Sequence, residues 1–433
     1  MNARRKLLVV EVAALGWDLV SRRKAGAEGF AFQALETCFP ALTCTAQAGF
    51  RTGARPAQHG LLGNGIFLRE LRRPMFWEQS AALVSGPRFW APARAGGRRV
   101  GLMFWQQSLG EAADLLLSPK PVHKHHGGMI QDGYSQPPDL YDRITRAVGR
   151  PFNLMHYWGP LASAKSSDWI VAALRYVMQS PDLAPDLLLG YLPHLDYDLQ
   201  RHGPESAAAG RALARVLDYL CRLRAAAEAS GYELVVWGDY AIEPVAGSPV
   251  FPNKALRQAG FFKTRAVRGR LYPDFFASCA FALCDHQIAQ IHVQDADTRR
   301  VADVLARLEG VDRVLDRAEQ DELGVGHPRG GELMLVAEKG RWLAYPWWDR
   351  VKEAPDYASH VDIHNKPGYD PCELFFGWPP PGISTDPSRI KGTHGRPGHP
   401  VAWWSSFPMN PAPATLYQLA EAVQQRLESG TAS

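Results

Sequence analysis

Carboxylate and imidazole side chains follow several apolar runs of this 433-residue sequence. The run 187–193 leads into PHLDYDLQRHGP, and the run 232–238 places Asp239 and Tyr240 directly after its end. Two later stretches, HVDIHNKPGYDP and KGTHGRPGH, carry further histidines. Carboxylate oxygens and imidazole nitrogens are the ligands that proteins offer to Zn²⁺ and related divalent ions. Each Asp alone could simply cap a helix or turn, but their repetition after successive apolar runs predicts a metal site.

A hydroxyl near the start of the chain could act as a nucleophile beside such a metal. In FPALTCTAQAGFRTG, Pro40 stops the preceding structure, and residues 44–50 can form a helix that ends at Thr52-Gly53. Thr43 then lies at the helix N-terminus, where free backbone N–H groups and the helix dipole favour an anion. A hydroxyl so placed beside a metal can ionise and attack phosphorus. The simpler alternative is that Thr43 is an ordinary N-cap residue.

Buried strands that alternate with helices must position these residues. Apolar runs predict strands at 7–13, 98–105, 187–193 and 232–238, and periodic patterns predict helices at 205–230, 298–308 and 415–427. This alternation is typical of an α/β fold with three α/β/α layers and a mostly parallel central sheet. Ligands of such sheets bind beyond the carboxyl ends of the strands, which is where the Asp and His clusters fall.

The segment 245–345 has a different pattern, which predicts a smaller α+β insertion. It contains short β-like runs, and the sequences ELMLVAE and RWLAYPW predict a pair of strands around the turn Lys339-Gly340. The polar, proline-rich stretch 350–400 returns the chain to the core. We therefore expect a single catalytic domain over 1–433, with the insertion at 245–345 inside it.

Composition narrows the class of protein. Hydrophobic residues make up 46% and charged residues 21% of the chain, which excludes a disordered protein. A net charge of +4 is too small to predict nucleic acid as a partner, and no apolar run reaches the ~18 residues of a membrane span. The N-terminal run LLVVEVAALGW contains Glu11 and fits a first strand better than a secretion signal. Six cysteines without CxxC spacing then predict reduced thiols and a cytoplasmic location.

The segment from Pro40 to Asn64, PALTCTAQAGFRTGARPAQHGLLGN, resembles the nucleophile region of the alkaline-phosphatase superfamily. The nearest branch is the type I phosphodiesterase/nucleotide pyrophosphatase family, whose pattern is PTxTxPNHxxxxTGxxPxxHGIxxN. The spacing matches without a gap over the whole segment. The resemblance implies an alkaline-phosphatase-like fold, with Thr43 as the covalent nucleophile and Asn64 as a side-chain donor to a phosphoryl oxygen.

The stretch PHLDYDLQRHGP resembles the metal-binding motif EPDxxGHxxGP of the same family. Alignment on the final Gly-Pro implies Asp196 and Gln200 as the metal-binding pair. Alignment on Asp-x3-His implies Asp198 and His202 instead. We prefer Asp196, because the Gly-Pro turn fixes the register, and keep His202 as an open alternative.

Two further family motifs are altered in this chain. The first strand of the family ends in Asp-Gly, whereas this register holds Ala13-Ala14. Glu11, two residues earlier, lies on the same strand face and is long enough to replace the missing ligand. The family motif SDHG is similar to Gly-Asp239-Tyr240, which keeps the Asp as a metal ligand but replaces the His by Tyr.

Histidines elsewhere could complete the site. RGGELMLVAEKG is similar to the family's RxGDLxLVAEPG, and the last metal-binding His that the resemblance implies has two candidates. His364 has the right position in the chain, within HNKPGYDP, and His394 has the better local motif, GTHG. His125 and His126, in HKHHGG, are candidates to bind substrate or to compensate for lost ligands, and Tyr240 is a third substrate-binding candidate.

The resemblance implies a metal-dependent hydrolase of phosphate esters, acting on phosphodiester or pyrophosphate bonds through a covalent phosphothreonine. It implies two Zn²⁺ ions, one of them open to loss or exchange for Mn²⁺, because Gln and Tyr are weaker zinc ligands than His. Two alternatives stay open: a phosphonate or monoester hydrolase on the same scaffold, and a metal-depleted protein that binds a phosphorylated metabolite without turnover. The expected partner is a small phosphorylated metabolite or nucleotide, neither a nucleic-acid polymer nor a membrane, and the sequence predicts no oligomeric state.

Overall fold

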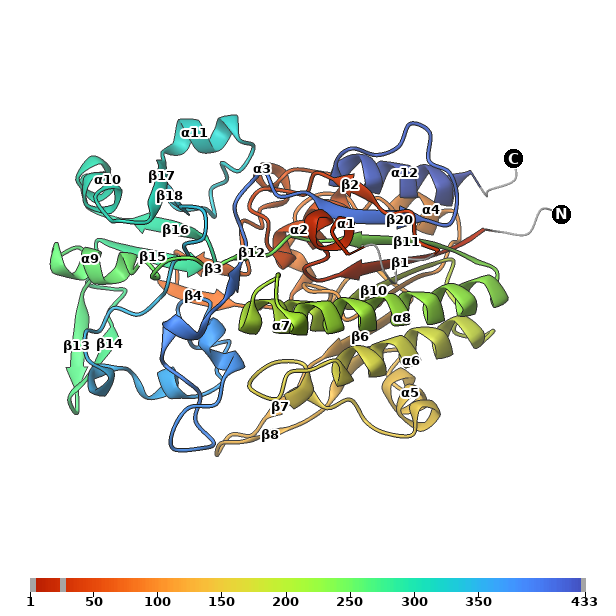
Figure 1. The fold of residues 1–433 in the computed structure, drawn as a ribbon, viewed down its shortest axis with the longest axis horizontal. Coiled ribbons are helices and arrows are strands. Elements are labelled where there is room, and N and C mark those ends of the chain that lie inside the picture. The colour runs from red at the N-terminus through yellow and green to blue at the C-terminus, as the bar shows by residue number, and fades with distance from the viewer. Residues whose placement is uncertain (1–4, 24–28, 430–433) are drawn as a thin grey trace.

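The computed structural model describes residues 5–23 and 29–429, and its largest element is an eight-stranded sheet (Figure 1). The order of its strands is β2-β20-β11-β1-β10-β5-β6-β9. Their bounds are β1 (Lys6–Val12), β2 (Gln33–Leu35), β5 (Val100–Met103), β6 (Leu115–Pro119), β9 (Gly133–Gln136), β10 (Leu187–Leu192), β11 (Tyr232–Gly238) and β20 (Val401–Ser405). The strands from β11 to β6 are parallel, whereas β20, β2 and β9 at the two edges pair antiparallel. The predicted α/β class with a mostly parallel sheet is confirmed.

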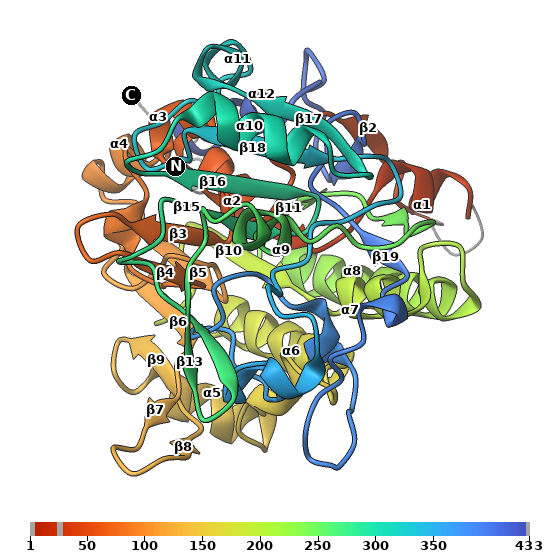
Figure 2. The ribbon, with the colours of Figure 1, turned by 90° about the vertical axis from the view of Figure 1, so that its left-hand side faces the viewer.

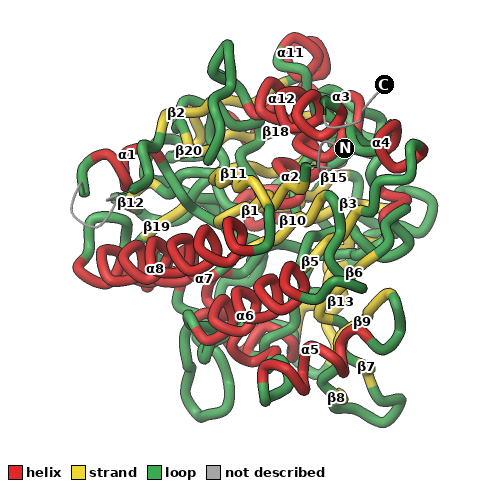
Figure 3. Tube along the Cα trace, turned by 90° about the vertical axis from the view of Figure 1, so that its right-hand side faces the viewer, coloured by secondary structure: helices red, strands yellow, loops and turns green. Residues whose placement is uncertain are grey.

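Helices cover both faces of this sheet. One layer holds α5 (Leu140–Val148), α6 (Lys165–Gln179), α7 (His194–His202) and α8 (Ala207–Ala229), and Figure 3 shows α5, α6 and α8 stacked along that face. The opposite layer holds α2 (Thr43–Thr52), α4 (Ala91–Ala95) and α12 (Leu416–Glu428), and two short helices, α1 (Trp17–Ser21) and α3 (Pro56–His59), follow β1 and α2 in the chain. Because both faces are covered, the central strands are continuous apolar runs without alternation.

A second, four-stranded antiparallel sheet lies beside the first (Figure 2). Its strands, in the order β15-β16-β18-β17, are β15 (Ala280–Asp285), β16 (Ile288–Val293), β17 (Val311–Leu315) and β18 (Leu333–Ala337). The helices around it are α9 (Pro252–Gln258), α10 (Thr298–Ala306) and α11 (Arg317–Glu322), and the sheet has a buried apolar cluster of its own. We propose that these elements form the insertion at 245–345.

Four two-stranded ribbons complete the fold. They are β3 (Gly65–Leu68) with β4 (Arg73–Phe76), β7 (Val122–His123) with β8 (Met129–Ile130), β12 (Glu243–Pro244) with β19 (Gly392–Thr393), and β13 (Thr264–Val267) with β14 (Arg270–Pro273). The hairpin β3–β4 belongs to the early part of the chain but packs on the second sheet, where the Phe67 ring meets Phe281 edge to face with 4.6 Å between centroids. None of the helices in the described ranges is long and apolar enough to cross a bilayer.

The predicted strand pair around Lys339-Gly340 is wrong. ELMLVAE does form β18, but β18 pairs with β16 and β17. The segment 341–347 turns away and makes a single bridge, from Leu343 to Val250. Both runs are apolar because both are buried, and burial alone does not specify a strand's partner.

The parallel register brings three strand ends to one level. Val12 of β1 pairs with both Leu192 of β10 and Gly238 of β11. The residues that follow each strand therefore meet at the same edge of the sheet, as expected for the ligand site of an open parallel sheet.

Candidate active site

Thr43 and Asn64 lie together at the start of α2. The helix begins at Thr43, and Leu42 before it is extended and offers no side-chain cap. Both side chains are buried, at 3% and 4% exposure. The side-chain oxygen of Asn64 accepts a hydrogen bond from the Cys44 N–H at 3.1 Å, which holds Asn64 against the first turn of the helix.

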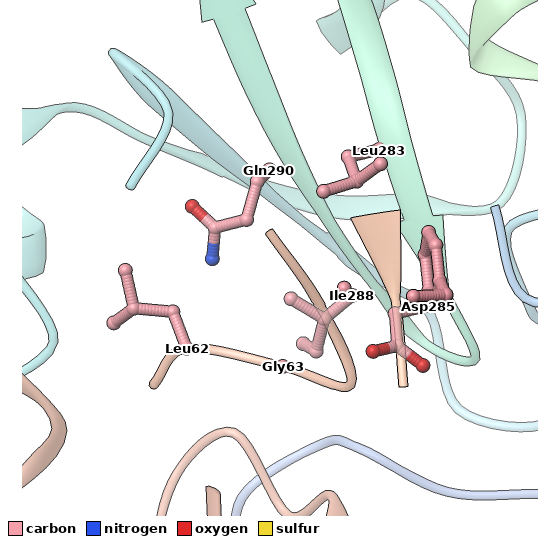
Figure 4. Close-up of a pocket in the computed structure, with 8 residues that line it drawn as sticks. Leu62, Gly63, Leu283, Asp285, Ile288 and Gln290 are labelled. Carbon is pink, nitrogen blue, oxygen red and sulfur yellow. The ribbon is translucent and has the colours of Figure 1, made fainter. Parts of the chain in front are cut away.

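A carboxylate from the second sheet fixes Asn64 from its other side. Asp285, the last residue of β15, accepts hydrogen bonds from the Asn64 backbone N–H at 2.6 Å and from its side-chain amide at 3.1 Å. Burial raises the pKa of Asp285 to about 7, although the hydrogen bonds from Asn64 oppose this. Asp285 also lines a small pocket together with Leu62, Gly63 and Ile288, and Figure 4 shows its carboxylate beside the Gly63 backbone.

Glu11 and Asp239 form a buried carboxylate pair at the ends of β1 and β11. One Asp239 oxygen accepts the N–H groups of Ala14 at 3.0 Å and Tyr240 at 2.9 Å. Its other oxygen and both oxygens of Glu11 have no hydrogen-bond partner among the described residues. Burial and the neighbouring Asp239 raise the pKa of Glu11 well above its usual value, and burial raises that of Asp239 to about 8, with Asp196 adding to the shift. Glu11 thus lies close enough for the charge of Asp239 to act on it.

Asp196, on α7, accepts hydrogen bonds from neighbouring side chains on both of its oxygens. Its Oδ1 accepts the Tyr240 hydroxyl at 3.0 Å, and its Oδ2 accepts the Gln200 amide at 2.6 Å. The Gln200 amide also bonds the Tyr369 hydroxyl at 2.9 Å. Burial raises the pKa of Asp196 to about 7, against these hydrogen bonds. Gln200 lies on the buried helix face with Asp196, whereas His202 is exposed, so the structure places the Gly-Pro register and not the Asp-x3-His register at the centre.

Four aromatic rings are stacked beside Asp196. His394, 2% exposed, donates from Nδ1 to the Ala41 carbonyl at 2.8 Å. The Tyr240 ring lies parallel to it, with 3.5 Å between centroids and 3° between planes. The His286 ring is 3.7 Å from His394 and 3.8 Å from Tyr369. Burial lowers the pKa of His394 to about 3 and that of His286 well below its usual value, so both rings are neutral at pH 7.

Three other predicted site residues lie apart from this centre. His364 is exposed, with its Nδ1 3.1 Å from the Phe76 carbonyl oxygen. His125 and His126 are exposed in the loop that joins β7 and β8. Of the two candidates for the last histidine, the structure therefore places His394, and not His364, beside Tyr240.

A family model for type I phosphodiesterase/nucleotide pyrophosphatase matches residues 7–370 of the chain. The chain belongs to this family. Members of the type I phosphodiesterase family are divalent-metal-dependent hydrolases of phosphoesters, so the chain is a hydrolase of the phosphodiesterase/nucleotide pyrophosphatase type. A search of curated protein sequences finds no match to the chain.

Solved structures of related proteins confirm the alkaline-phosphatase-like fold. Phosphonoacetate hydrolase from Sinorhizobium meliloti, in complex with phosphonoacetate, is 15% identical, with 99% of this chain and 97% of that chain covered and a TM-score of 0.64. Human ectonucleotide pyrophosphatase/phosphodiesterase 5 is 12% identical over 98% of this chain and 95% of its own, with a TM-score of 0.62. The murine enzyme was solved in an inactive form with AMP, at 13% identity and a TM-score of 0.59.

The residues at the centre of this chain do not fit the pair of zinc ions that the resemblance implies. Nowhere in the described ranges do three or more His, Cys, Asp or Glu side chains gather as a metal site. Ala13 has no ligand atom, Gln200 and Tyr240 stand in for two histidines, and both donate hydrogen bonds to Asp196. The expectation of two Zn²⁺ ions on this ligand set is therefore not supported by the geometry, and we draw no step through zinc.

Three residues of the centre are not among the predicted site residues: Asp285 and His286, which the sequence equally explains as a strand-edge pair, and Tyr369. Asp285 and His286 are a polar pair within the apolar run FALCDHQIAQIHV, and that interruption is their signal in the sequence. Tyr369 follows Gly368 in the stretch HNKPGYDP, in which His364 is the predicted site residue.

Proposed function

We propose that this hydrolase acts on the phosphodiester or pyrophosphate bond of a small phosphorylated metabolite, and that Thr43 receives the phosphoryl group. The observation that carries the proposal is the hydrogen bond from Cys44 N–H to Asn64, which ties Asn64 to the first turn of α2. The start of this ten-residue helix favours a negatively charged ligand. A phosphoryl group at Thr43 would have that helix end on one side and the Asn64 amide on the other.

Asn64 would hold a phosphoryl oxygen. An amide has two N–H donors, and one of them already bonds Asp285. The second remains for an oxygen that gains charge in the transition state. Asp285 then acts as a positioning residue, because its carboxylate fixes both the backbone and the side chain of Asn64.

A panel of substrates tests this function. The purified protein is assayed with an aryl phosphodiester, an aryl phosphomonoester, a dinucleoside pyrophosphate and phosphonoacetate, each with Zn²⁺, Mn²⁺ or EDTA. We expect the diester or pyrophosphate to be turned over fastest. A preference for the monoester or for phosphonoacetate would instead favour a monoester or phosphonate hydrolase on the same scaffold.

Thr43→Ala should reduce turnover by at least about 10³-fold, because it removes the hydroxyl that receives the phosphoryl group. Thr45→Val is the matched control, since Thr45 lies on the same turn but its buried hydroxyl has no hydrogen-bond partner among the described residues. This control should keep the wild-type rate. Full activity in Thr43→Ala would rule out a phosphothreonine intermediate.

A second candidate function is binding of a phosphorylated metabolite without turnover. The enclosed Asp196 favours it, because both oxygens of this carboxylate are taken by Tyr240 and Gln200. Calorimetry with AMP and with phosphonoacetate separates the two functions. Binding with no product after prolonged incubation in any metal would support the binder and contradict the hydrolase.

A further inference from the structure

We infer that side chains take the place of a metal ion in the Asp196–His394 half of the centre, so that this half binds no zinc. The inference goes beyond the proposed function and does not depend on it. It follows from what each ligand atom already contacts.

Both oxygens of Asp196 are already bound. The Tyr240 hydroxyl lies 3.0 Å from Oδ1 and the Gln200 amide nitrogen 2.6 Å from Oδ2, both at hydrogen-bond distance. A zinc ion would have to lie about 2.0–2.2 Å from one of these oxygens. An ion on the lone pair that already accepts a hydrogen bond would displace a buried donor, and an ion on the other lone pair would have to fit beside that donor.

His394 is held by a backbone carbonyl and by two rings. Its Nδ1 donates to Ala41 at 2.8 Å, so only Nε2 could ligate. Tyr240 is stacked in parallel at 3.5 Å, and His286 lies 3.7 Å away, so rings pack closely against His394 where the family would place its metal ligands. The hydroxyl of the same Tyr240 is bonded to Asp196, so this one side chain spans the two residues that a metal would join.

The remaining ligand position is also closed. Gln200 replaces the histidine of the family motif, and its amide is shared between Asp196 and the hydroxyl of Tyr369. Tyr369 in turn stacks on His286 at 3.8 Å. Hydrogen bonds and ring stacking thus connect all the side chains of this half without a cation.

Metal content tests the inference directly. Wild type and the double variant Gln200→His, Tyr240→His are dialysed against EDTA, reloaded with a small excess of ZnCl2 and analysed by mass spectrometry of the metal. We expect the double variant to hold about one more equivalent of zinc per chain than wild type, because it adds two imidazoles to the Asp196 carboxylate and the His394 imidazole already there. Tyr240→Phe is the matched control and should gain no zinc, since it removes only the hydroxyl.

A second comparison does not depend on the folding of the double variant. Asp196→Asn should leave the zinc content of the otherwise wild-type protein unchanged, because Asp196 binds no ion there. Loss of an equivalent in Asp196→Asn, or two equivalents in wild type, would overturn the inference, as would a folded double variant that gains none. Activity is measured separately, so failure of the proposed hydrolysis would not alter these metal counts.

Discussion

His292, on β16, shows how a single buried residue can set acid sensitivity. Its ring lies against Phe67 and Phe281, with 4.9 Å and 5.2 Å between centroids, and neither nitrogen has a hydrogen-bond partner among the described residues. Burial lowers the pKa of His292 to about 3. In the unfolded chain its pKa is about 6.5. Below pH 6.5 the unfolded state therefore binds the proton more readily, and stability falls as the pH falls towards the folded pKa.

His292→Phe should stabilise the protein. At pH 7 the free energy of unfolding should rise by roughly 1 kcal/mol, because an unpartnered polar group is replaced by an apolar ring of similar shape. At pH 5 the advantage should grow by about 2 kcal/mol, the cost of keeping His292 neutral. Denaturant titrations at both pH values measure this. His125→Phe, at an exposed site, is the control, and equal acid sensitivity of wild type and His292→Phe would contradict the assignment.

Some residues of the candidate site can be predicted from the sequence and others cannot. Thr43 and Asn64 were predictable because the pattern that contains them is contiguous. The choice between His364 and His394 was not, because each fits a different criterion of spacing. Asp285 could not be placed, because its contact with Asn64 spans 221 residues and no local pattern encodes such a meeting.

At the scale of elements, the hairpin β3–β4 joins the early chain to the second sheet. Phe67 is 4% exposed and packs against both Phe281 and Phe275. The strands of the central sheet were predictable because burial on both faces makes them continuous apolar runs. The pairing of the second sheet was not, since the apolar segment 341–347 is as buried as a strand without being one.

Phe67→Ala should lower the free energy of unfolding by about 3–5 kcal/mol, the usual cost of removing a buried phenylalanine ring. Phe276→Ala, at a side chain that is 75% exposed, should change it by less than about 0.5 kcal/mol. Thermal and denaturant unfolding followed by circular dichroism would measure both. A small effect of Phe67→Ala would show that the hairpin is not anchored on the second sheet.

At the scale of the whole molecule, the centre is built from two sheets. The central sheet and its helices supply Thr43, Asp196 and Asp239, whereas β15 of the second sheet supplies Asp285. Asp285 reaches the nucleophile region through its two hydrogen bonds to Asn64. The two residues should therefore act as one unit in phosphoryl binding.

A double-mutant cycle tests this coupling. Asn64→Ala should reduce kcat by about 10²–10³-fold, the cost of losing one donor to a charged oxygen. Asp285→Ala should cause a smaller loss through misplacement of Asn64, and the double variant should be no worse than Asn64→Ala alone. Asp285→Asn should recover part of the rate, since it keeps one acceptor. Losses that multiply would show that Asp285 acts independently of Asn64.

The 221-residue separation of Asn64 and Asp285 also bears on how the chain reaches its native state. During synthesis, the segment that carries Thr43, Asn64 and Phe67 leaves the ribosome long before β15 and β16 exist. Contacts of such large sequence separation close late and slow folding. Until the second sheet is synthesised, the apolar side chains of the hairpin β3–β4 have no partner to pack against. We therefore expect aggregation and dependence on chaperones to be greatest at this stage of synthesis.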